Sequence, residues 1–234
     1  MQHRTASAAV LGITALTLAI LPGCSPSSPA RTTTSSSDSA APRPDGNGRG
    51  DAVLSSPELA VRLLDENDLV TGYTRKPDRP SGGDADVTVL GCPALDDLGA
   101  DAATGSGGGL DFPRSAKTAF TYTGSGEVTE ELYSDAAIKL SDGTGRIFDA
   151  MTGCPAYQVL AGSTPVDIAT QEAPAPRLGD ERWSHLLTFS SGGAETVVKQ
   201  TAIRDGSVLL IVSGSPALVD RHLDTALAKA TATG

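Results

Sequence analysis

The sequence predicts an α+β fold in which helices pack on an antiparallel β-sheet. Residues 195–213, "ETVVKQTAIRDGSVLLIVS", contain two β-branched runs joined by Asp205-Gly206, a pair typical of a type I′ hairpin turn. Residues 117–134 form a second candidate hairpin around Gly124-Ser125-Gly126. Amphipathic segments lie before, between and after these hairpins. Because strands joined by hairpins rather than by helical crossovers pair antiparallel, the class is α+β.

The N-terminus predicts export. Residues 1–23 carry Arg4 and no acidic residue, and an apolar run extends from Ala8 to Leu21. This run of about 14 residues is too short to span a bilayer as a mature helix and is typical of a signal peptide. Leu21-Pro22-Gly23-Cys24 resembles the bacterial lipobox, which implies cleavage before Cys24 and lipid attached to its sulfur. We expect a lipoprotein on the outer face of the cytoplasmic membrane. An ordinary secretory signal with an incidental cysteine is the alternative.

Residues 24–50 predict a disordered tether. The segment, "CSPSSPARTTTSSSDSAAPRPDGNGRG", contains no Val, Ile, Leu, Met, Phe, Trp or Tyr. Without apolar side chains to bury, a segment cannot offset the entropy that it loses on ordering. Its root-mean-square reach is about 30 Å. We expect it to hold the folded domain away from the membrane.

Residues 51–234 are long enough for one folded domain with its own core. The whole chain has a formal net charge of −10, and the tether is slightly basic, so the domain is more acidic still. Nucleic-acid phosphates and anionic lipid headgroups would repel such a domain. We therefore expect no nucleic-acid partner and no binding along the membrane surface.

Residues 54–70 predict the first helix of this domain. Ser55 or Ser56 is the expected N-cap, with Pro57 in the first turn and Glu58 close to the cap. Its expected buried stripe consists of Leu59, Ala60, Leu63 and Leu64. The Gly, Pro and Asp content of residues 71–86 predicts a loop after it.

Two further helices are expected at 135–151 and 215–230. The first contains Gly143 and Gly145, which weaken a helix, and it ends at Gly153-Cys154-Pro155. The second begins with Ser215 as its cap and Pro216 at its first position.

The segment 182–190, "RWSHLLTFS", alternates as a half-buried strand does. Trp183 and His185 share one face of this strand with Leu187 and Phe189. A core position is the expectation for both, with His185 hydrogen-bonded, and the alternative is that they line a ligand cleft. They are the candidate ligand-site residues of the chain.

Cys92 and Cys154 occupy a repeated setting, GCPALDDL at 91–98 and GCPAYQVL at 153–160. Neither belongs to a CxxC pair, which a thioredoxin-type centre requires and a zinc site commonly contains, and the domain has only His185 and His222 as histidines. Two cysteines in an exported domain pair with each other by default. We therefore predict one structural disulfide, Cys92–Cys154, and no metal site.

The sequence carries no catalytic signature. It has no GxSxG elbow, no Ser followed by Lys at the third position and no P-loop. The glycine-rich stretch at 105–110 is interpreted as a surface loop, with a flap over a cleft as the alternative. We expect a protein that is not an enzyme and holds no cofactor.

A resemblance rests on three features: a helix that leads into a cysteine at 134–154, the alternating strand at 182–190, and the hairpin and closing helix after 195. Together they are similar to the PknH-like extracellular sensor domain, which occurs on actinobacterial receptor kinases and as stand-alone lipoproteins. The resemblance covers about the last 110 residues. Members carry two disulfides, whereas this domain has cysteines for one. It implies an α+β domain with a cleft that binds an envelope ligand without catalysis.

The leading hypothesis is a membrane-anchored, non-catalytic module that binds a ligand or acts as a sensor. A lipid- or glycolipid-carrying lipoprotein is one alternative and would need an apolar cavity of some hundreds of Å³. A protein-interaction module without a small ligand is another, and it would expose a large apolar patch. A hydrolase would require His185 or His222 within hydrogen-bond reach of a serine or an acid in a cleft.

Overall fold

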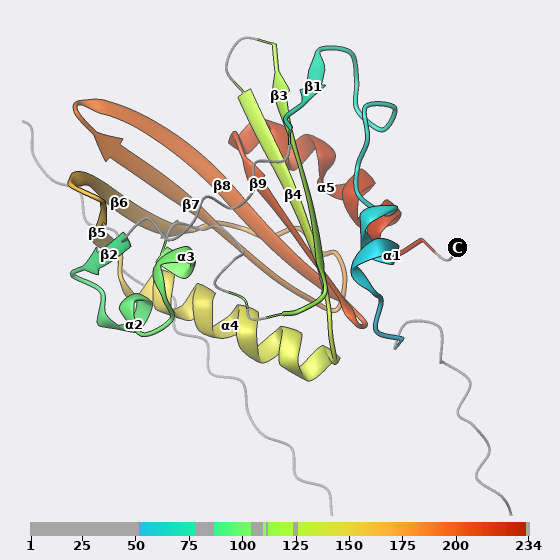
Figure 1. Cartoon of the computed structure of the whole chain (residues 1–234), viewed down its shortest axis with the longest axis horizontal. Coiled ribbons are helices and arrows are strands. Elements are labelled where there is room, and N and C mark those ends of the chain that lie inside the picture. The colour runs from blue at the N-terminus through green and yellow to red at the C-terminus, as the bar shows by residue number, and fades with distance from the viewer. Residues whose placement is uncertain (1–51, 78–86, 104–109, 111, 124–125, 233–234) are drawn as a thin grey trace, which may run out of the picture. The chain divides into compact units, whose positions relative to one another are not determined.

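The computed structural model describes residues 52–77, 87–103, 110, 112–123 and 126–232. In this part of the chain the strands form one antiparallel sheet in the order β1-β3-β4-β9-β8-β7-β6-β5-β2 (Figure 1). The strands are β1 (Tyr73–Arg75), β2 (Val87–Leu90), β3 (Ser115–Tyr122), β4 (Gly126–Ser134), β5 (Ala156–Ala161), β6 (Thr164–Glu172), β7 (Glu181–Ser191), β8 (Ala194–Asp205) and β9 (Val208–Gly214). The helices are α1 (Ser56–Ala60), α2 (Pro93–Asp96), α3 (Ala100–Ala103), α4 (Ala137–Gly153) and α5 (Pro216–Ala230). The predicted α+β class is confirmed. The predicted signal peptide and tether lie outside the described residues.

The sheet carries a separate hydrophobic core on each face. The first core gathers side chains of α2, α3 and α4 with those of β2 and β5–β9, including Leu95, Met151 and Leu187. The second core gathers α1 and α5 with β3, β4, β8 and β9, including Leu59 and Val219. The two faces exist because successive side chains of a strand point to opposite sides. Strand β7 follows this rule as predicted, since Trp183, Leu187 and Phe189 all pack in the first core.

The hairpin between β8 and β9 is confirmed, with its turn one residue later than predicted. Asp205 pairs with Val208, so the connection is Gly206-Ser207 and not Asp205-Gly206. Gly206 has φ 56°, a conformation that glycine adopts without steric cost. Asp180 fixes the turn, because its carboxylate accepts a hydrogen bond from the Gly206 amide at 3.0 Å.

Helix α1 is shorter than predicted. Its start is as expected: Ser55 caps it, and Glu58 completes a capping box with the Ser55 amide. It ends at Ala60 rather than near residue 70. After Ala60, side chains form hydrogen bonds with backbone groups that would pair with each other in a longer helix. Glu130 accepts from the Leu64 amide, and Arg75 donates to the Leu64 carbonyl. The predicted stripe is otherwise buried, except for the exposed Ala60.

The segment predicted as a loop after α1 contains the short edge strand β1, which pairs with β3. Residues 78–86 of that segment lie outside the described residues.

The predicted disulfide between Cys92 and Cys154 is confirmed. Their Cα atoms are 5.8 Å apart across a sequence separation of 62 residues. The bond joins the residue before α2 to the residue after α4, and Cys92 is buried in the first core. Among the described residues, no helix combines the length and the apolar character that crossing a membrane requires.

Candidate functional site

A large hollow in the described part of the chain lies along α4, and we call it the α4 cleft. Its volume is about 830 Å³. One wall is the exposed side of α4, and the other is formed by Leu98, Leu110 and Phe112. This volume is within the range of small-molecule sites.

Two glycines shape the α4 wall. A Cβ atom at Gly143 would lie 2.9 Å from the Phe112 ring, so the absence of a side chain allows this ring to pack on the helix. A Cβ atom at Gly145 would meet nothing within 4 Å. Gly145 leaves the helix backbone open toward the cleft. A glycine inside a helix costs about 1 kcal/mol relative to alanine, and no neighbouring group requires glycine at this position.

The lining of the α4 cleft combines apolar and charged side chains. Apolar surface comes from Leu98, Leu110, Phe112 and Ile147. Charges of both signs come from Lys139, Asp142, Arg146 and Asp149. Such a lining suits a ligand that has an apolar part and polar or charged groups.

A second, smaller hollow of about 330 Å³ contains Trp183, and we call it the Trp183 cleft. Phe148, Glu172 and Arg182 line it together with Trp183. Asp149 contributes to both clefts, so the two adjoin along α4. Half-buried Trp183 also belongs to the first core, with its ring centroid 6.2 Å from that of Phe148.

His185 does not contribute to the lining of either cleft. It is fully buried, and its ring lies 4.4 Å from the Phe148 ring, centroid to centroid. Neither ring nitrogen has a partner of standard hydrogen-bond geometry, so the expected hydrogen bond is at most a weak one, with the side chain of Gln200. Burial lowers the pKa of His185 to about 4, and the side chain of Gln200, its neighbour on β8, opposes part of this shift. The imidazole is therefore neutral at physiological pH.

The histidine geometry that a hydrolase would require is not formed among the described residues. His222 pairs with the Tyr73 hydroxyl at 2.6 Å and not with a serine or an acid. His185 is buried and neutral, as described above. In the same part of the chain, no group of three or more His, Cys, Asp or Glu residues could hold a metal ion.

Trp183, a candidate from the sequence, lines the smaller cleft, whereas the α4 cleft is not among the expectations from the sequence. The cleft depends on contact between the segment before β3 and a helix that follows the β3–β4 hairpin, and no local pattern encodes this contact. The one local signal of the cleft in the sequence is the glycine pair Gly143 and Gly145 in the helix. Leu110, at the end of the glycine-rich stretch, lines the cleft, while residues 105–109 lie outside the described residues.

Comparison with known proteins relates the chain to an extracellular domain. No family model matches the sequence, and no curated protein matches it. The fold resembles that of the extracellular domain of PknH from Mycobacterium tuberculosis, with a TM-score of 0.55 and 12% identity over 78% of this chain and 97% of that chain. An uncharacterised Mycobacterium smegmatis protein, the Rv0999 ortholog, has a TM-score of 0.40 and 12% identity over 71% of this chain and 93% of its own.

At 12% identity the likeness to the PknH domain concerns the fold. It supports the resemblance seen in the sequence and extends it beyond the last 110 residues. The disulfide, for its part, is typical of proteins in oxidising compartments outside the cytoplasm.

Proposed function

We propose that this chain is an extracytoplasmic, non-catalytic ligand-binding module of sensor type, with the α4 cleft as its binding site. The observation that carries the proposal is the cleft of about 830 Å³ on a fold like that of the PknH extracellular domain. The ligand has an apolar part that contacts Phe112 and Ile147. Its polar groups contact the charged side chains of α4.

The proposed anchor is lipid on Cys24, left as the mature N-terminus after residues 1–23 are removed. Residues 24–50 then connect the anchor to the domain, which stands on the outer face of the cytoplasmic membrane. The lipobox-like Leu21-Pro22-Gly23-Cys24 supports this part of the proposal. The partners are thus the membrane, through the anchor, and an envelope ligand.

The chemistry of the cleft favours this function over a lipid carrier. Lys139, Asp142, Arg146 and Asp149 place charges around the cleft, whereas burial of an acyl chain requires an apolar lining. The large exposed apolar side chains are dispersed over several elements, as Val61 after α1, Leu90 on β2 and Ile138 on α4. Dispersed apolar residues are ordinary on protein surfaces and do not favour a protein-interaction module.

The experiment that tests the site is a chemical-shift mapping of the isotope-labelled, disulfide-bonded domain. The probe is the small-molecule fraction, below about 1 kDa, of envelope from the organism that encodes the chain. We expect the shifted backbone amides to cluster at Gly145, Ile147 and Phe112.

A matched pair of variants separates binding from folding. Gly145→Leu extends a side chain into the cleft and should abolish the shifts, whereas Gly145→Ala adds one methyl group in open space and should retain them. Shifts confined to the Trp183 cleft, or no shifts at all, would contradict the assignment of the α4 cleft.

A further inference from the structure

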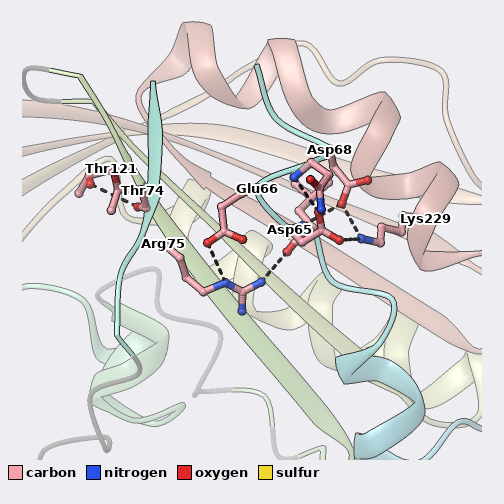
Figure 2. A network of polar contacts seen from close by, with 9 residues as sticks. Asp65, Glu66, Asp68, Thr74, Arg75, Thr121 and Lys229 are labelled. Carbon is pink, nitrogen blue, oxygen red and sulfur yellow. Dashed lines mark hydrogen bonds and ion pairs between the residues drawn. The ribbon is translucent and has the colours of Figure 1, made fainter. Parts of the chain in front are cut away.

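A second feature of the chain lies on the opposite face of the sheet, where the segment Arg62–Leu69 connects α1 to the turn before β1. Leu63, Leu64 and Leu69 bury their side chains in the second core. Polar contacts to other elements hold the backbone of this segment and its acidic side chains (Figure 2). The segment is therefore docked by side chains that belong to distant parts of the chain.

Cations hold the segment from two sides. Lys229, in the last turn of α5, contacts Asp65 at 2.8 Å and Asp68 at 2.5 Å. Arg75 on β1 lies 3.6 Å from Glu66 and donates to the Leu64 carbonyl at 3.1 Å. Figure 2 shows these side chains converging on the segment.

Beneath the segment lies Glu130 of β4, which is only 1% exposed. One carboxyl oxygen accepts a hydrogen bond from the Leu64 amide at 2.6 Å. The other oxygen is buried and has no hydrogen-bond partner. Thr118, directly opposite on β3, also has a buried hydroxyl without a partner. A carboxylate with one hydrogen bond in such a place costs several kcal/mol of desolvation.

The charged groups around Glu130 do not compensate for this burial. Burial raises the pKa of Glu130 to about 7, and the repulsion of Asp68 adds to the increase. The Leu64 hydrogen bond and the charges of Lys229 and Arg75 oppose it. Other titratable groups on the segment, α1, β1 and α5 are Arg62, Asp65, Glu66, Glu58, Tyr73, Asp220, Arg221, His222 and Asp224.

We propose that Glu130 makes the docking of the Arg62–Leu69 segment dependent on protonation, so that the segment is held when the carboxyl is neutral and loosened when it ionises. Protonation removes the buried charge and leaves an oxygen that accepts from the Leu64 amide. It also gives the second oxygen a proton to donate. Ionisation restores the charge, and local opening, which admits water, relieves its cost. The domain would thus respond to pH at a place remote from its ligand cleft.

The sign follows from proton linkage. In the open state the carboxyl is hydrated and has its ordinary pKa near 4.5, which is lower than the value in the docked state. The stabilisation of docking by the bound proton is therefore complete below pH 4.5 and is lost as the pH rises through 7. Between pH 4.5 and 7.5 the opening constant should increase about 100-fold.

Global unfolding would conceal this dependence. Burial lowers the pKa values of His185 and His222, so these residues stabilise the fold above their unfolded pKa of 6.5 and this contribution is lost as the pH falls. Their effect opposes that of Glu130 over much of the same pH range. The measurement must therefore be local.

The test is native-state hydrogen exchange of the Leu64 amide in the domain, corrected for the intrinsic pH dependence of exchange. We expect its protection factor to fall about 100-fold from pH 4.5 to 7.5. Glu130→Gln keeps an acceptor for the Leu64 amide but does not titrate, so its protection should change by less than a few-fold. Glu66→Gln removes an exposed carboxylate of the same segment and should behave like the wild-type chain.

Equal pH dependence in the wild-type and Glu130→Gln proteins would overturn the proposal, as would the absence of any dependence in the wild type. A carbon-13 titration of the Glu130 carboxyl gives an answer even if the variant fails to fold. A midpoint near 7 supports the proposal, and a midpoint near 4.5 excludes it.

Discussion

The two glycines of α4 give opposite predictions for the same substitution. Gly145→Ala should stabilise the domain by about 1 kcal/mol, because alanine is the better helix former and its methyl group enters open space. Gly143→Ala gains the same helix propensity but places a methyl group 2.9 Å from the Phe112 ring. Overpacking of this kind costs about 1–3 kcal/mol, so we expect no net gain or a loss.

Urea unfolding followed by circular dichroism measures both variants. In a thermal unfolding scan of a domain of this size, the same gain of 1 kcal/mol corresponds to a rise of about 2–4 °C in Tm. In a Phe112→Ala background, Gly143→Ala should recover the full gain, because its obstacle is removed. If Gly145→Ala destabilises the domain by 1 kcal/mol or more, another part of the chain occupies the space beside Gly145, and the reasoning about the cleft is refuted.

Three further predictions concern the bridge, a buried histidine and the anchor. Replacing both Cys92 and Cys154 by alanine should cost about 4 kcal/mol in urea unfolding, from the chain entropy of a loop of this length; a loss below 1 kcal/mol would contradict it. Between pH 7 and pH 4 the wild type should lose about 3 kcal/mol of unfolding free energy because His185 becomes protonated on unfolding, and His185→Gln should not show this loss. Parallel pH profiles of the two proteins would refute this. Cys24→Ala should release the protein into the medium, as immunoblotting of cell fractions would detect, and retention in the membrane fraction would argue against the anchor.

Much of the fold could be predicted because its signals are local. The Ser55–Glu58 capping box, the alternation of β7 and the hairpin at Gly206 each depend on residues close in sequence. The disulfide was predictable from cysteine number and the expected export. Strands β5 and β6 were not predicted, because β6 contains Pro165 and is largely exposed, and neither strand shows the β-branched hairpin pattern of β8 and β9.

The remaining features depend on contacts between distant residues. Helix α1 ends early in part because Glu130, 66 residues beyond Leu64, takes an amide that the helix would need. The α4 cleft likewise forms where Phe112 meets Gly143. The burial of His185 follows from the strand pattern, but the poor geometry of its hydrogen bonding depends on neighbouring strands.

The most direct test of the proposed function is native mass spectrometry of the full chain, extracted from the membrane of its own cells. We expect the wild-type and Gly145→Ala proteins to carry a bound small molecule that Gly145→Leu lacks. A wild-type protein without a bound molecule, or a Gly145→Leu protein that retains it, would contradict a ligand site in the α4 cleft.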